Sequence, residues 1–141
     1  MSPDELKIHA CRVTEELLTQ GDLAVVDEVV APNVEGIRHW AAGLRQAFPD
    51  LCAIVEEEVA EGNTVVQRLT YCGTQTGTFL GLPPTGNRAT WLAMEFRRLG
   101  PDGKFTEQWM VADLLGVLQQ LGIIPAAFGV RRDAADAAES H

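Results

Sequence analysis

A carboxylate at the end of a predicted strand, Asp113, is the residue best placed by the sequence to do chemistry. The segment 105–113 alternates as a β-strand does, so Trp109, Val111 and Asp113 are expected on one face. A carboxylate in apolar surroundings tends to have a raised pKa, which suits a general acid or base. Asp is also a favoured N-cap, and Asp113 directly precedes a predicted helix, so capping is an equally good interpretation.

Helical patterns that end at Gly or Pro fill the first third of the chain. Three helices are expected there, at residues 2–20, 22–31 and about 34–48. From Cys52 the apolar period changes to two, which is typical of strands. Strands are expected at 52–59, 64–73, a short segment within 74–86, 88–99 and 105–113, before a short helix at 114–121. Helices followed by a curved antiparallel sheet predict an α+β fold, whose concave side can leave a pocket.

The composition is that of an acidic globular protein. Its 141 residues are 46% hydrophobic and 22% charged, with a formal net charge of −9. One folded domain is expected over residues 1–125, followed by a flexible acidic tail at 126–141. The negative charge argues against nucleic acid and anionic membranes as partners, because both need a basic patch. The sequence has neither a signal-peptide pattern at its start nor an apolar run of transmembrane length, which predicts a cytoplasmic protein.

Cysteines and histidines show no spacing typical of a metal site. The cysteines are odd in number and far apart: Cys11, Cys52 and Cys72. They predict a reducing compartment and ordinary buried thiols, without a disulfide framework. The histidines also lack ligand spacing: His9, His39 and His141. The acidic run Glu56–Glu58 is interpreted as a solvated stretch that protects a sheet edge.

Four stretches, in order along the chain, resemble one family. They are LTQGDLAVVD at 18–27, VEGI at 34–37 leading to FPDL at 48–51, GTQTGTFLGLPPTG at 73–86, and EQW at 107–109 with Asp113 and the last helix. By these motifs, residues 5–122 resemble the SnoaL-like polyketide cyclase family, within the nuclear transport factor 2-like (ketosteroid isomerase-like) superfamily. The resemblance implies a conical α+β barrel that holds a small hydrophobic substrate without a metal or organic cofactor. It also implies that Asp113 is the catalytic acid or base and that the chain is a homodimer.

Glu95 stands where the family often has an aspartate or histidine, on the strand before Asp113. If the hairpin between these strands is centred near Asp102, Glu95 is expected opposite Trp109, and Asp113 opposite Trp91. The two carboxylates would then share a face and lie ~13 Å apart at the usual strand rise. They would be too far apart to share a proton, but could reach the two ends of one substrate.

Glu95 also has a structural interpretation, as one partner of a salt bridge with Arg68 or Arg97. The same hairpin places Arg97 opposite Glu107, which could pair with it instead. Some members of the superfamily open epoxides with an acid–arginine–acid set, and Glu95, Arg97 and Asp113 are of the right types. Their Glu-x-Arg order is unlike that pattern.

The remaining candidates are expected to bind substrate: Asn33, Trp40, Gln75, Phe79, Trp91 and Trp109. Gln75 replaces a histidine that the family often has there, and it cannot transfer a proton at neutral pH. Asn33 precedes a short connection where the family usually has about a dozen further residues, within the range of a functional loop. Either the pocket entrance is shorter here, or a disordered loop is missing from the sequence.

The sequence thus favours an enzyme that cyclises a polyketide-derived intermediate in antibiotic biosynthesis, as an isomerase or lyase. Asp113, with Glu95 as its partner, would perform general acid/base catalysis in a hydrophobic pocket. The alternatives are an epoxide hydrolase or epoxide-opening cyclase of the same fold, and a non-catalytic small-molecule-binding module.

Overall fold

The computed structural model describes residues 1–34 and 36–125, so the predicted tail at 126–141 lies outside the described residues. Its first layer is helical: α1 (Pro3–Arg12), the π-helix η1 (Val13–Thr19), α2 (Val25–Val29), the 3₁₀-helix η2 (Pro32–Val34) and α3 (Gly36–Ala47). Ser2 caps α1 by accepting the N–H of Glu5 at 3.2 Å, as the sequence predicts. Among the described residues, no helix is long and apolar enough to cross a membrane.

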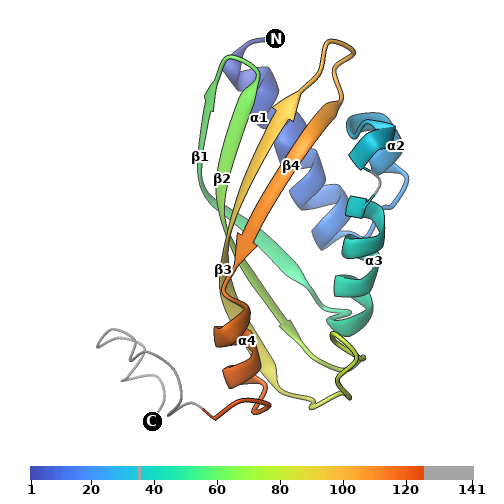
Figure 1. Ribbon diagram of the computed structural model, residues 1–141, viewed down its shortest axis with the longest axis vertical. Coiled ribbons are helices and arrows are strands. Elements are labelled where there is room, and N and C mark those ends of the chain that lie inside the picture. Colours follow the sequence, from blue (N-terminus) through green and yellow to red (C-terminus); the bar gives the residue numbers. More distant parts are fainter. Residues whose placement is uncertain (35, 126–141) are drawn as a thin grey trace.

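One antiparallel sheet forms the second layer. Its strands lie in the order β1 (Cys52–Glu61), β2 (Thr64–Thr74), β3 (Arg88–Leu99) and β4 (Phe105–Ala112), and α4 (Leu114–Gln120) follows β4. The strands twist and curve strongly beside the helices, with α3 on the side of β4 (Figure 1). The predicted α+β fold is confirmed, with the four strands forming an open, curled sheet. Within 74–86, the expected short strand is a single bridge between Phe79 and Leu82.

The sheet has a buried inner face and an exposed outer face. On β3 the inner side chains include Trp91, Glu95 and Arg97, which are at most 7% exposed. Leu92 and Met94, which alternate with them, are 48% and 43% exposed on the outer face. The inner face packs against the helices and encloses the hydrophobic core. Polar side chains on that face are therefore held away from water.

A β-bulge sets the register between β3 and β4. Leu99 pairs with Phe105, as expected for a hairpin centred near residue 102. Arg98 then pairs with Glu107, so Thr106 is an extra residue that opposes nothing on β3. Every pair beyond the bulge is shifted by one residue from the simple antiparallel register.

The predicted pairs between β3 and β4 are wrong because of this bulge. Glu95 lies opposite Met110, and Trp109 lies opposite Phe96. Arg97 lies opposite Gln108, and Glu107 instead pairs with Arg98 through an exposed ion pair of 3.0 Å. A shift of one residue moves each side chain to the other face of a sheet.

A second bulge, at Glu56, has the same effect on β1. Val55 pairs with Leu69, but Glu57 pairs with Arg68 and Glu58 with Gln67. Since Gln67 is fully buried on the inner face, its neighbour Glu58 is turned inward as well. The interpretation of the acidic run as wholly solvated is therefore wrong for Glu58.

Candidate functional site

The inner face of β3 carries a buried ion pair. Glu95 is 1% exposed and Arg97 is fully buried, and Arg97 Nη2 donates to Glu95 Oε2. The other carboxylate oxygen accepts the hydroxyl of Tyr71, on the neighbouring strand β2, at 2.8 Å. Burial and the adjacent Glu95 raise the pKa of Tyr71, so its hydroxyl remains a hydrogen-bond donor. Because a charged pair is costly to withdraw from water, such a pair is a candidate for function.

Amide side chains complete the surroundings of Arg97. Nη1 donates to Gln67 Oε1 at 2.9 Å, and Nε donates to Gln108 Oε1 at 3.1 Å. Thr14, in the π-helix η1, donates to the same Gln67 oxygen at 3.4 Å. With the bond to Glu95, Arg97 uses three of its five N–H groups in these contacts. The predicted salt bridge of Glu95 with Arg97 is confirmed, whereas Arg68 pairs with Glu57 at 3.0 Å.

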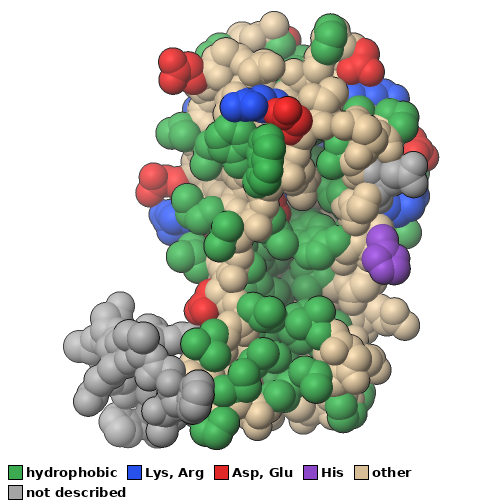
Figure 2. Space-filling view, viewed as in Figure 1, with side chains coloured by type: hydrophobic (Ala, Val, Ile, Leu, Met, Phe, Trp, Pro, Cys, Tyr) green, Lys and Arg blue, Asp and Glu red, His purple; other side chains and the backbone are tan. Residues whose placement is uncertain are grey.

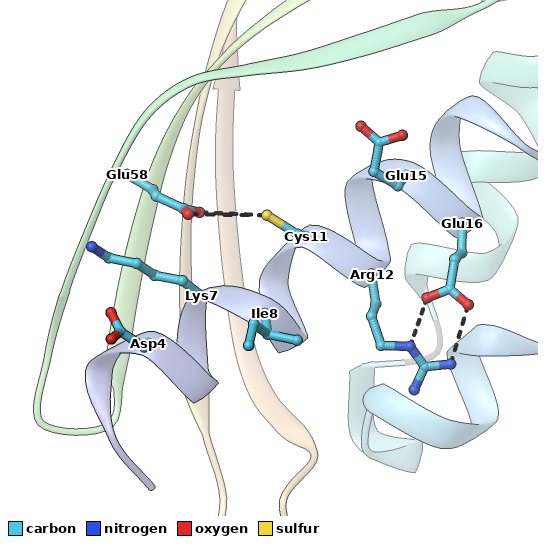
Figure 3. A pocket seen from close by; sticks show the side chains of 8 residues that line it. All are labelled: Asp4, Lys7, Ile8, Cys11, Arg12, Glu15, Glu16 and Glu58. Atoms are coloured by element: carbon cyan, nitrogen blue, oxygen red, sulfur yellow. Dashed lines mark hydrogen bonds and ion pairs between the residues drawn. The ribbon is translucent and has the colours of Figure 1, made fainter.

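The polar network continues along the inner face of the sheet to a groove beside α1. Gln67 Nε2 donates to Glu58 Oε2 at 3.0 Å, and Cys11 Sγ lies 3.8 Å from the same oxygen. Figure 3 shows the Cys11 sulfur directed at Glu58 at the wall of this groove. Burial and the neighbouring Glu58 raise the pKa of the Cys11 thiol. A raised pKa lowers the fraction of reactive thiolate at neutral pH.

A pocket of about 380 Å³ opens between α3 and β4. It is lined by Asn33, Val34, Gly36, Ile37, Trp40, Gln108 and Met110. Figure 2 shows this side of the molecule, where a hollow between β4 and α3 is walled largely by hydrophobic side chains. Gln108 and Met110 stand directly opposite Arg97 and Glu95, and such opposed Cβ atoms lie about 4.5–5.5 Å apart. The wall of the pocket therefore adjoins the buried ion pair.

Asp113 directly follows β4, at the start of α4, and is not among the residues that line the pocket. Its side chain is exposed, and Oδ1 accepts the N–H of Gly116 at 3.0 Å as the N-cap of α4. Trp109 and Val111, on the outer face of β4, are 54% and 73% exposed. The predicted position of Asp113 opposite Trp91 is wrong, because the bulge at Thr106 shifts the register by one residue, and the N–H of Asp113 instead donates to the carbonyl of Leu92 at 3.0 Å. Capping, the alternative interpretation, describes its contact with α4, and its catalytic role stays a prediction.

The predicted substrate-binding residues are divided by the fold. Asn33 and Trp40 line the pocket, and Asn33 also donates to the carbonyl of Thr106 at 3.0 Å. Trp109 packs edge-on against Phe96 on the outer face, with ring centroids 5.3 Å apart. Substrate contacts of Asn33 and Trp40 therefore stay predictions, whereas Trp109 lies on the far side of the sheet from this pocket.

Gln75 fastens the loop between β2 and β3. It is fully buried, its Nε2 donates to the carbonyl of Pro83 at 3.2 Å, and its Oε1 accepts the hydroxyl of Thr85 at 2.7 Å. These bonds satisfy the amide within the protein. Its predicted role in substrate binding gains no support from this position.

Phe79 and Trp91 belong to an aromatic cluster in the core. Trp91 stacks on Tyr71 with ring centroids 5.5 Å apart, and it lies 5.1 Å from Phe48. Phe79 meets Phe48 edge-on at 5.3 Å. Trp91 thus supports Tyr71, the partner of Glu95, and its contact with substrate stays a prediction.

Sequence reasoning missed several members of the site, on three strands and a helix: Thr14, Glu58, Gln67, Tyr71 and Gln108. A signal was present on β2, where Gln67 alternates with the apolar residues Val65 and Leu69 and so shares their buried face. Among the described residues, no three His, Cys, Asp or Glu side chains are grouped as metal ligands would be.

Solved structures of similar chains share this architecture. AclR from Streptomyces galilaeus, a provisionally assigned hydroxylase, is 27% identical with a TM-score of 0.80, over 99% of this chain and 92% of that one. A provisionally assigned SnoaL-like polyketide cyclase from Jannaschia sp. CCS1 is 26% identical with a TM-score of 0.78, over 87% of this chain and 95% of that one. TsrD from Streptomyces laurentii is 27% identical with a TM-score of 0.74, over 86% and 95% of the two chains.

A comparison with curated proteins gives no significant match. The family model described as SnoaL-like polyketide cyclase matches residues 8–121, which span the second half of α1, the helices that follow it, the whole sheet and α4. The match covers the buried ion pair, the pocket wall on β4 and the four motifs of the sequence. The chain therefore belongs to the SnoaL-like polyketide cyclase family.

Proposed function

We propose that this chain is a cofactor-independent cyclase that acts on a polyketide-derived intermediate, with Glu95 as the general acid/base. The observation that carries the proposal is the buried Glu95–Arg97 pair beside the pocket between α3 and β4, in a chain of this family. A largely apolar pocket with a few polar groups suits a small hydrophobic substrate. The proposed setting is antibiotic biosynthesis in the cytoplasm.

The proposed reaction needs only proton transfer and proximity. Glu95 removes a proton from a carbon next to a carbonyl group, and the resulting enolate carbon attacks a second carbonyl carbon in the same molecule. The new alkoxide then receives the proton from Glu95, so no atom is lost and the reaction is an isomerisation. Loss of the new hydroxyl as water would make the reaction that of a lyase. Holding the two ends together can contribute several kcal/mol, roughly up to 7–11 kcal/mol in well-oriented systems.

The neighbours of Glu95 have supporting roles in this proposal. Arg97 and Tyr71 orient the carboxylate through one hydrogen bond to each oxygen. The remaining N–H groups of Arg97 and the amide of Gln108 can donate to the enolate oxygen. Met110 and Gln108 cover the pair on the pocket side, and rotation of these flexible side chains would admit the substrate.

The test measures ring formation from a panel of linear poly-β-ketone esters, followed by the new chromophore and by chromatography with mass detection. Glu95→Gln should lower turnover by about 10²–10⁴-fold, the usual contribution of a general acid or base. Tyr71→Phe, which keeps the ion pair, should lower turnover less and guards against a folding defect in the first variant. Asp113→Asn is the matched control and should retain turnover. The opposite pattern would return the catalytic role to Asp113.

Two other functions compete with this proposal. A non-catalytic binding module is favoured by the exposed, capping position of Asp113, and saturable binding of the esters without any turnover would support it. An epoxide hydrolase would need a second acid beside the arginine. The other side chains to which Arg97 donates hydrogen bonds are the amides of Gln67 and Gln108, which makes that reaction the weaker candidate.

A further inference from the structure

Two cysteines that lie far apart in the sequence are cross-strand neighbours in the sheet. Cys52, the first residue of β1, pairs directly with Cys72 near the end of β2. Both side chains are partly exposed. They alternate with the buried residues Ala53 and Tyr71, so they lie on the outer face. The sequence prediction of scattered, buried thiols is wrong for this pair.

β1 is an edge strand, and the hydrogen bonds on its side away from β2 show which type of antiparallel pair Cys52 and Cys72 form. Thr19 Oγ1 accepts the N–H of Ala53 at 3.1 Å and lies 3.4 Å from its carbonyl oxygen, so both backbone groups of Ala53 point away from β2. Backbone groups of adjacent residues point to opposite sides of a strand, so the N–H and C=O of Cys52 point toward β2. Cys52 and Cys72 are therefore a hydrogen-bonded pair of the antiparallel ladder. Such pairs have Cα atoms about 5.5 Å apart, within the range that a disulfide spans.

We propose that Cys52 and Cys72 are the site of a reversible cross-strand disulfide. Opposed Cβ atoms in hydrogen-bonded pairs lie near the upper end of the range of about 4.5–5.5 Å, whereas a disulfide draws them to about 3.8 Å. The ends of the strands must therefore approach each other slightly. A disulfide formed under such strain, at a partly exposed position, is the kind that is readily reduced.

The bond forms by exchange with a small disulfide such as oxidised glutathione. One thiolate attacks that disulfide and releases one reduced glutathione, and the second thiolate then attacks the mixed disulfide and releases the other. Two thiols are oxidised and one disulfide is reduced, so electrons and protons balance. Burial, then the adjacent Cys72, raise the pKa of Cys52, so exchange is slow at neutral pH and faster in mild alkali.

The third cysteine is separated from this pair by the sheet. Cys11 lies on α1 against Glu58, which faces the inner side of β1 (Figure 3). It cannot reach either thiol without disruption of the core. The fold therefore allows one intramolecular linkage, between Cys52 and Cys72, and leaves Cys11 reduced.

The disulfide would join β1 to β2 at the end of the sheet that contacts the aromatic cluster. Tyr71 precedes Cys72 in the chain, and Gly73 follows it. Gly73 packs closely against Phe48, because a Cβ added to this glycine would lie 3.0 Å from Phe48 Cβ. A covalent bond at this point would restrain the strands beside Tyr71. The disulfide itself does not depend on the proposed cyclase activity, because its test measures only the oxidation state of the full chain.

The test equilibrates the reduced protein with graded ratios of oxidised and reduced glutathione at about pH 8.5, near the ordinary thiol pKa. Samples are quenched with acid, alkylated and digested. Trypsin cuts after Arg45, Arg68 and Arg88, so Cys52 and Cys72 fall on separate peptides. We expect these peptides to be joined with the loss of two hydrogen atoms, while Cys11 is alkylated, and the bond to open again as reduced glutathione is raised.

Two variants make the outcome decisive. Cys11→Ser should oxidise as the wild type does, whereas Cys52→Ser should leave Cys72 only as a mixed disulfide with glutathione. The proposal is overturned if the wild type accumulates mixed disulfides or linked pairs of chains in place of the joined peptides. It is also overturned if the bond forms but resists a large excess of reduced glutathione, because the disulfide is then not reversible.

Discussion

Each face of β3 and β4 carries a glutamate–arginine ion pair, but one pair is buried and the other is exposed to solvent. On the inner face, Glu95 and Arg97 form an ion pair whose side chains are 0% and 1% exposed. On the outer face, Arg98 and Glu107 form one whose side chains are 45% and 43% exposed. Arg97 and Arg98 are consecutive in the sequence, and the pleat of β3 directs them to opposite faces of the sheet. Burial, more than residue type, therefore makes Glu95 a candidate for chemistry.

Removal of the arginine from each pair is the strongest test of this comparison. Arg97→Met leaves the Glu95 charge buried without its cation, so we expect a loss of about 3–5 kcal/mol in the free energy of unfolding. Arg98→Met breaks a solvated pair and should cost at most about 1 kcal/mol. Urea denaturation followed by circular dichroism measures both. Similar losses in the two variants would mean that the inner pair is not isolated from water.

A second test concerns the outer face as a dimer interface, because several of its exposed residues are apolar. Val111 is 73% exposed, beside Trp109 and Met94. We propose that this face forms the homodimer, as patches of this kind often mark interfaces. Val111→Lys should convert dimers into monomers in light scattering at equal concentration. Ile8→Lys, at a 62% exposed position on α1, is the control and should leave the mass unchanged. A wild type that is already monomeric would refute the dimer.

A third test asks what the Asp113 carboxylate does for stability. Asp113→Ala removes the acceptor for the N–H of Gly116, and a lost N-cap costs about 1 kcal/mol. Asp113→Asn keeps a capping oxygen and should unfold at nearly the same denaturant concentration. If both variants lose the same stability, the charge of Asp113 matters more than its capping oxygen.

The smallest expected effect concerns an exposed carboxylate at the end of the sheet. Asp50 Oδ1 accepts the N–H of Thr74 at 2.7 Å, and this bond lowers the pKa of Asp50. A carboxyl whose pKa is lower in the folded state adds stability above the ordinary value of about 3.9, and that stability is lost as the pH falls through the lowered value. Asp50→Asn should therefore flatten the acid limb of a stability–pH curve slightly. An acid limb of unchanged steepness in Asp50→Asn would show that the bond from Thr74 does not contribute to stability.

Local patterns were enough to predict most of the fold. The Ser2 cap and the glycines and prolines between helices mark element ends, because few residues fit those backbone positions. The alternation on β2 and β3 likewise predicts strands with one buried face. These signals depend only on neighbouring residues, which explains why they are readable without the structure.

The candidate site was harder to predict because it depends on register. Thr106 and Glu56 have no local feature that marks them as bulges, yet each decides which face the following residues join. Glu95 was identified, with Arg97 among its possible partners, since both lie on a strand without a bulge between them. Asp113 was misplaced because it follows the bulge on β4. Tyr71 and Gln67 become recognisable as partners only when the strands are aligned.

The extra residue at Thr106 also determines how this hairpin would respond to a change in chain length. Deletion of Thr106 would leave Leu99 opposite Phe105 and Arg98 opposite Glu107, so the ladder would continue without a bulge and each later side chain of β4 would keep its present face. Gln108 and Met110 would still line the pocket, while Glu107, Trp109 and Val111 would stay on the outer face. The pocket wall would therefore persist although the bulge itself is lost.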